Sequence, residues 1–229
     1  MTCKNQRNVK KAPLPERHFT RFEEGMHAVT HGLGALLGIF ALILLCIKSA
    51  DDTYALFSSI IYGISLIFLY AASGSFHATG IFYRDGKTSR FREFTMKCDH
   101  SLIYFLILGT YTPACISAMR NTAGYIVFSI VGACCLLGAI LNIINVDRFL
   151  KISLILYVVS GWTIGAALYP YYLAVGAGGI LYLLLGGVAY TVGIFFYKAR
   201  HKIYMHTVWH LFVLLGSILH FFMVYLYCI

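Results

Sequence analysis

Long apolar runs alternate with short polar segments along most of this chain. A bilayer is spanned by roughly 20 apolar residues in an α-helix, and seven runs come near that length: Ala28–Ile47, Tyr54–Phe76, Leu102–Met119, Gly124–Ile144, Ile152–Tyr169, Tyr171–Tyr197 and Val208–Ile229. The pattern predicts an all-α, polytopic membrane protein built as a bundle of seven transmembrane helices. Because the connections are short, we expect one membrane domain, residues 25–229, after a basic cytoplasmic tail, residues 1–24.

The composition excludes a soluble protein. Hydrophobic residues make up 59% of the chain, charged residues only 12%, and the mean hydropathy is +0.76; about a quarter of the residues are charged in a typical soluble domain. The N-terminal stretch Met1–Arg21 is polar and basic and has no apolar core of its own. We therefore expect no cleavable signal sequence there and expect the first spanning helix to direct insertion.

The positive charges predict the orientation of the bundle. When the loops are assigned alternately to the two sides, sixteen of the eighteen Lys and Arg residues share one side, and only Lys48 and Arg120 lie opposite. Cytoplasmic loops carry the excess of positive charge, so the N-terminus is predicted in the cytoplasm and the C-terminus outside. The net charge of +9 thus reports topology, and no nucleic-acid partner is expected.

Four residues with metal-ligand chemistry are predicted near the cytoplasmic face. His77 closes the second apolar run, Asp99 opens the third, and His206 and His210 open the seventh. His206 and His210 are one helical turn apart and share a helix face, about 6 Å apart along the axis. Catalytic zinc takes three protein ligands and keeps a fourth position for water. We therefore predict a Zn²⁺ site formed by His77, His206 and His210.

Asp99 and Ser73 are the predicted catalytic partners of that site. Asp99 is assigned to hold the water and accept its proton, the role of the Glu that is absent from His206-Thr-Val-Trp-His210. Ser73, four residues before His77 on the same face, is assigned to donate a hydrogen bond beside the metal. Simpler interpretations compete: an aspartate often caps a helix N-terminus, and histidines at helix ends often bind headgroups or neighbouring helices.

Several motifs together resemble the haemolysin III family of the progestin and adipoQ receptor superfamily. They are Ser73-x-x-x-His77, Lys97-x-Asp99-x-Ser101, Gly109-Thr-Tyr-Thr-Pro113, His206-x-x-x-His210 and the opening Glu24-Gly-Met-His27-Ala-Val-Thr-His31-Gly-Leu-Gly34. The resemblance covers nearly the whole chain. It implies a multi-pass protein of the bacterial plasma (inner) membrane, with inner-face zinc held by the three matching histidines and Asp99 on the metal-bound water.

The resemblance also implies an activity, because the superfamily is similar to adiponectin receptors and, more distantly, to alkaline ceramidases. We therefore expect a metal-dependent hydrolase that acts on a membrane lipid amide or ester and affects lipid homeostasis. The alternatives are a pore-forming, cytolytic protein and a receptor or sensor of membrane state with a structural zinc ion. A membrane lipid is the expected partner, and glycine-rich faces permit an oligomer without predicting one.

Other residues receive lesser assignments. Glu24, His27 and His31 lie near the start of the first helix. The two histidines could form a second site or a proton path, but we favour packing and interfacial roles for them. His220 lies too deep to share the metal and is expected to bond another helix. Pro170 is predicted to mark the turn into the sixth helix, and Cys98 is a possible competitor for zinc.

Overall fold

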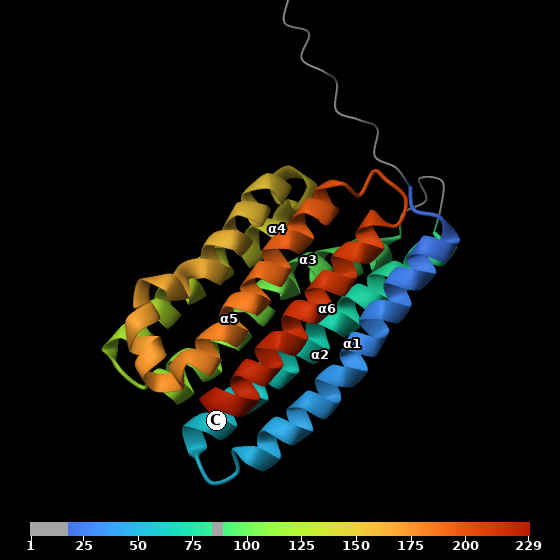
Figure 1. The fold of residues 1–229 in the computed structure, drawn as a ribbon. Helices are drawn as coiled ribbons and strands as arrows, with labels where there is room; N and C mark the ends of the chain where they lie inside the picture. The colour runs from blue at the N-terminus through green and yellow to red at the C-terminus, as the bar shows by residue number, and fades with distance from the viewer. Residues whose placement is uncertain (1–17, 84–88) are drawn as a thin grey trace, which may run out of the picture.

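The computed structural model describes residues 18–83 and 89–229, and the described chain is all-helical (Figure 1). Five helical stretches are long and apolar enough to cross a membrane, the longest being Thr122–Lys198 with 77 residues. The chain is therefore a multi-pass integral membrane protein. Its helices are α1 Arg21–Lys48, α2 Thr53–Phe82, α3 Arg90–Tyr111 with a π-helical continuation Thr112–Met119, α4 Thr122–Trp162 with a 3-10 turn Thr163–Ala167, α5 Leu168–Lys198, and α6 Met205–Met223 with a π-helical continuation Val224–Cys228.

Two residues interrupt the longest helical stretch. Asn145 inside α4 is extended (φ −163°, ψ 106°), and Gly176 inside α5 has φ 67° and ψ −174°, a conformation that glycine adopts without a steric penalty. The prediction that Pro170 marks the turn into the sixth helix was wrong, since the break lies at Gly176. Pro170 is in the first turn of α5, where a backbone N–H has no partner within the helix and proline is tolerated.

Side-chain caps explain where the helices begin. Thr20 and Glu23 form a capping box at the start of α1: the Glu23 N–H donates to Thr20 Oγ1 at 3.1 Å, and the Thr20 N–H donates to Glu23 Oε2 at 3.0 Å. Ser89 caps α3 in the usual way, by accepting a hydrogen bond from a backbone N–H of the first turn. Asp99 therefore lies well inside α3, and the alternative that it caps this helix is wrong.

Helix α1 packs along α2, and α5 packs along α6 (Figure 1). Tyr70 of α2 joins the two pairs through hydrogen bonds of its hydroxyl with the Val213 carbonyl and with Ser217 Oγ of α6. Close approach of α1 to α2 depends on Gly34, where an added Cβ would lie 2.5 Å from the Tyr70 ring. At the opposite end of the bundle from the start of α1, the C-terminus lies near the α1–α2 loop (Figure 1), and Lys48 Nζ donates to the Tyr225 carbonyl. Large apolar side chains such as Phe40 and Leu136 are 64% exposed, which suits a surface that faces lipid.

Candidate metal centre

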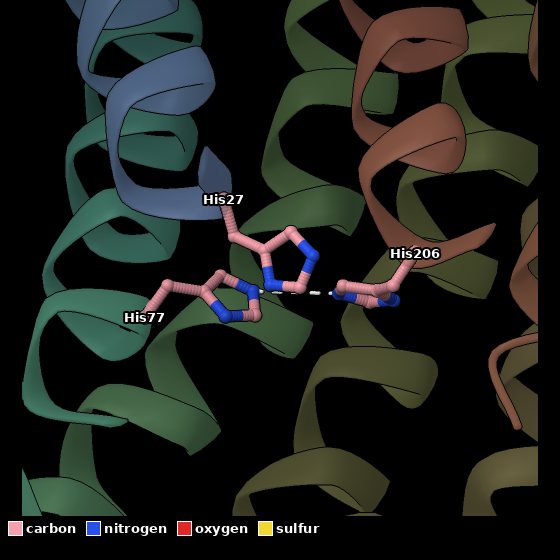
Figure 2. A group of neighbouring side chains, drawn as sticks. All are labelled: His27, His77 and His206. Carbon is pink, nitrogen blue, oxygen red and sulfur yellow. Dashed lines mark hydrogen bonds between the residues drawn. The ribbon is translucent and has the colours of Figure 1, made fainter. Parts of the chain in front are cut away.

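Five histidines from three helices converge where α1 begins, α2 ends and α6 begins. His27 and His31 come from α1, His77 from α2, and His206 and His210 from α6. Four of them are buried and His206 is half-buried. Figure 2 shows His27, His77 and His206 with their rings turned toward one another. Segments far apart in the sequence therefore present imidazole nitrogens to one small region.

His206 contacts both of the other histidines predicted as metal ligands, His77 and His210. His206 Nε2 is 3.4 Å from His77 Nε2 and 3.2 Å from His210 Nε2. Around a tetrahedral zinc ion with Zn–N distances of 2.0–2.1 Å, neighbouring ligand nitrogens are about 3.3 Å apart. The structure thus brings together the three histidines that the sequence singled out, and two of their three nitrogen separations are near this value.

A buried carboxylate orients His77. Glu24 of α1 accepts a hydrogen bond from His77 Nδ1 at 2.7 Å, and its other oxygen lies 3.6 Å from the Arg92 guanidinium of α3. Gly80 makes room for it, since an added Cβ there would lie 2.2 Å from Glu24 Oε1. With the His77 proton held on Nδ1, the Nε2 lone pair faces the cluster. This is the arrangement by which carboxylates commonly orient metal-binding imidazoles.

A threonine hydroxyl orients His210 in the same way. Thr30 Oγ1 lies 3.3 Å from His210 Nδ1 and also lies 2.9 Å from the carbonyl oxygen of Met26 and 3.0 Å from that of His27. The hydroxyl hydrogen is directed to these carbonyl oxygens, so Thr30 accepts the Nδ1–H of His210. The Nε2 lone pair of His210 therefore also faces His206.

Because His77 and His210 carry their protons on Nδ1, neither can donate a hydrogen bond to His206 through Nε2. A neutral imidazole carries hydrogen on one nitrogen only, so His206 can donate to His77 or to His210 but not to both. A cation would instead be bound by the Nε2 lone pairs of His77 and His210 that these tautomers leave free. Three of the five histidines, His27, His77 and His206, have ligand atoms that all lie within 4.8 Å of one another, and His210 is not in that group. This buried cluster can accordingly hold a metal ion.

A cavity of about 660 Å³ extends from the cluster into the bundle. Asp99, Ser73 and the histidines of the predicted site lie in its lining, with mostly apolar side chains around them. Asp99 Oδ2 is 3.8 Å from His100 Nδ1. Among the described residues, no hydrogen bond joins Asp99 or Ser73 to the five histidines. The structure therefore assigns both residues to the cavity beside the cluster rather than to the cluster itself.

The two α1 histidines, for which we favoured packing and interfacial roles, lie in the histidine cluster. The His27 ring centroid is 4.7 Å from that of His77, and His31 stacks on His210 at 3.6 Å. A signal for this placement was present in the sequence, because Glu24, His27 and His31 are spaced to share one helix face.

The prediction that His220 bonds another helix is confirmed. Its Nε2 lies 3.2 Å from the Leu183 carbonyl oxygen of α5.

Replacing Glu24 with glutamine should weaken metal binding by about 10- to 100-fold, since this is the usual cost of losing an outer partner of a ligand. Glutamine keeps the size of the side chain but removes the charge that holds the His77 proton on Nδ1. Competition with a fluorescent chelator measures the affinity. Glu93→Gln is the matched control, because Glu93 is an exposed α3 carboxylate paired with Lys97. Equal affinity in both variants would show that Glu24 does not orient a ligand.

The helices and the cluster define the class of protein: a multi-pass helical membrane protein with a buried histidine cluster, able to hold a metal, at one end of its bundle. More specifically, the chain belongs to the haemolysin-III related family, whose model matches residues 19–221. The resemblance inferred from the motifs is confirmed.

Relatives of known name match the chain over most of its length. It is 38% identical over 213 residues to "Hemolysin-3 homolog" of Bacillus subtilis (strain 168), covering 92% of this chain and 97% of the relative. It is 38% identical over 207 residues to "Hemolysin-3" of Bacillus cereus, covering 90% and 91%. It is 22% identical over 213 residues to the human "Monocyte to macrophage differentiation factor", covering 91% and 85%. The similarity thus includes every helix of the bundle.

Proposed function

We propose that this protein is a zinc-dependent hydrolase that cleaves an amide or ester bond of a membrane lipid. His77, His206 and His210 hold the metal, Asp99 accepts a proton from the attacking water, and Ser73 donates a hydrogen bond at the site. The observation that carries the proposal is the pair of Nε2 separations, 3.4 and 3.2 Å, that join the three histidines. The three histidines line a cavity whose walls are mostly apolar.

Each residue has a distinct part in the proposed reaction. A bound zinc ion supplies Lewis acidity, which activates water near neutral pH and polarises a carbonyl group. Asp99 lines the same cavity as the histidines and acts as the general base for water. Glu24 keeps His77 in the tautomer that binds metal. The apolar cavity walls hold the hydrocarbon chain of the lipid and keep bulk water from the reacting carbonyl.

We further propose that the chain crosses the membrane seven times, with the N-terminus in the cytoplasm. The breaks at Asn145 and Gly176 divide the 77-residue stretch into three helices, each of a length that crosses the hydrocarbon core. The other four stretches complete the seven. The distribution of Lys and Arg then assigns the histidine cluster to the cytoplasmic side.

Metal-dependent turnover of a lipid tests the proposal. We expect the purified protein in lipid nanodiscs to contain about one zinc ion per chain and to release fatty acid from a ceramide or from a lipid ester, as followed by mass spectrometry. Treatment with dipicolinate should abolish the release because three histidines hold the ion without a charged ligand. Added Zn²⁺ should restore it, whereas Mg²⁺, which prefers oxygen ligands, should not. Turnover that survives complete metal removal would contradict the proposal.

Membrane lysis is the second candidate function, because the two Bacillus relatives carry the name haemolysin. A pore releases a trapped dye without consuming lipid, whereas a hydrolase changes the lipids of the vesicle. Reconstitution in dye-loaded vesicles, with the lipids analysed afterwards, distinguishes the two. Dye release with intact lipids and with the metal removed would favour the pore.

A further inference from the structure

The rings of His27, His77, His206 and His210 are arranged as a tetrahedron. Their six centroid separations all lie between 4.7 and 5.2 Å. Four points with nearly equal mutual distances form a tetrahedron and have a single centre. Four imidazoles bound to one zinc ion at 2.0–2.1 Å would have ring centroids about 5 Å apart. The ring positions thus have the spacing of a four-histidine metal centre, and the ligand atoms of three of the four, His27, His77 and His206, all lie within 4.8 Å of one another.

The ring nitrogens of His27 are buried without a hydrogen bond in the described part of the chain, although Glu24 and Phe19 contact the ring. Its ring is fully buried, and within residues 18–83 and 89–229 neither ring nitrogen makes a hydrogen bond. Its Nδ1 is 3.7 Å from Glu24 Oε2, too long for a hydrogen bond. An unsatisfied buried polar group costs about 1–3 kcal/mol, so a ring held there without a ligand is unfavourable. Figure 2 shows it beside the contact between His77 and His206.

His31 does not share this geometry. It lies nearly parallel to His210, with an interplanar angle of 14° and a centroid separation of 3.6 Å. Imidazole lone pairs lie in the plane of the ring, so two parallel stacked rings cannot aim at one ion. Both α1 histidines are therefore buried beside the cluster, and in the described residues neither makes a hydrogen bond through its ring nitrogens. Only His27 occupies a corner of the tetrahedron.

We infer that His27 is a fourth metal ligand and that it closes the site at rest. This inference rests on the proposed function, in which three histidines hold the ion and the fourth position must open for water and substrate. Structural zinc sites have four protein ligands, whereas catalytic sites keep one position open. Withdrawal of His27 from the ion would then convert the closed form into the open one.

Contacts at the start of α1 hold His27 in place. Phe19 packs against both His27 and His206, with ring centroids 4.9 Å away in each case. Glu23, which completes the capping box with Thr20, also accepts a hydrogen bond from the Tyr204 N–H at the start of α6 at 3.1 Å. Movement of this first turn away from α6 would withdraw His27 and leave the other three histidines on their own helices.

X-ray absorption spectroscopy at the zinc edge tests the inference, because the outer-shell scattering counts coordinated imidazoles. We expect four imidazoles in the unmodified protein and three, with one oxygen, in His27→Ala and His27→Asn. Added imidazole should restore the fourth nitrogen in His27→Ala. Zinc affinity should fall about 10-fold or more in both variants. His31→Ala is the matched control: it removes a neighbouring α1 histidine and should keep four.

The other outcomes separate the two proposals. Three imidazoles and an oxygen in the unmodified protein, unchanged in His27→Ala, would overturn the role of His27 and leave the three-histidine hydrolase intact. Four imidazoles that persist in both His27 variants would also overturn it, since another residue would then supply the fourth nitrogen. Absence of bound metal in folded, unmodified protein that has been given zinc would overturn the proposed function, and the fourth ligand with it.

Discussion

Replacing His206 with alanine is expected to remove the bound metal. Its Nε2 lies 3.4 Å from that of His77 and 3.2 Å from that of His210, and it also belongs to the cluster with His27. Loss of the outer partner of a ligand already costs about 10- to 100-fold in affinity, so loss of this central ligand should cost more than about 100-fold. Zinc content by mass spectrometry and chelator competition measure the loss.

A second histidine of α6 provides the control for this variant. His220 is buried, and its Nε2 contacts the Leu183 carbonyl instead of the histidine cluster. His206 is partly buried. His220→Ala should lower the thermal stability and keep the metal, whereas His206→Ala should release the metal. If both variants keep a full complement of zinc, the cluster is not the metal centre. If both lose it, the loss reports general unfolding, and the unfolding temperatures measured without metal identify that case.

The architecture was largely predictable because bilayer thickness constrains the sequence so strongly. A run of about 20 apolar residues has few soluble alternatives, and the helices occur where these runs lie. The error at Pro170 has a local cause. Proline is a strong signal for a helix boundary, but it is tolerated in the first turn of a helix. The helix breaks at Gly176 because of that residue's backbone conformation, which the pattern of apolar residues does not predict.

The candidate site was predictable only in part. His77, His206 and His210 were brought together because helix ends on the same side of a membrane have similar depth. The partners Glu24 and Thr30 were missed because their contacts depend on how α1 is rotated toward α2 and α6. Rotation is determined by packing, such as the close contact of Gly34 with Tyr70, and not by the length of an apolar run.

Replacing Asp99 with asparagine should separate metal binding from catalysis. Asparagine has nearly the same size and keeps polar contacts in the cavity, but it cannot accept a proton from water at neutral pH. General-base catalysis contributes typically 10²- to 10⁴-fold, so lipid turnover should fall by about that factor. Because Asp99 lines the cavity without a hydrogen bond to the described histidines, zinc content should not change. Metal analysis and fatty-acid release are measured on the same preparation.

Asp147→Asn is the matched control, because this carboxylate lines the same cavity and carries the same charge. It should keep turnover within a few-fold, which separates the chemistry of Asp99 from the negative potential of the cavity. Equal loss in the two variants would assign the effect to that potential and not to a general base. Loss of zinc in Asp99→Asn alone would make Asp99 a ligand. The proton acceptor of the proposed reaction would then have to be another group in the cavity, and Glu24 would be a poor substitute because its carboxylate is already engaged with His77 and Arg92.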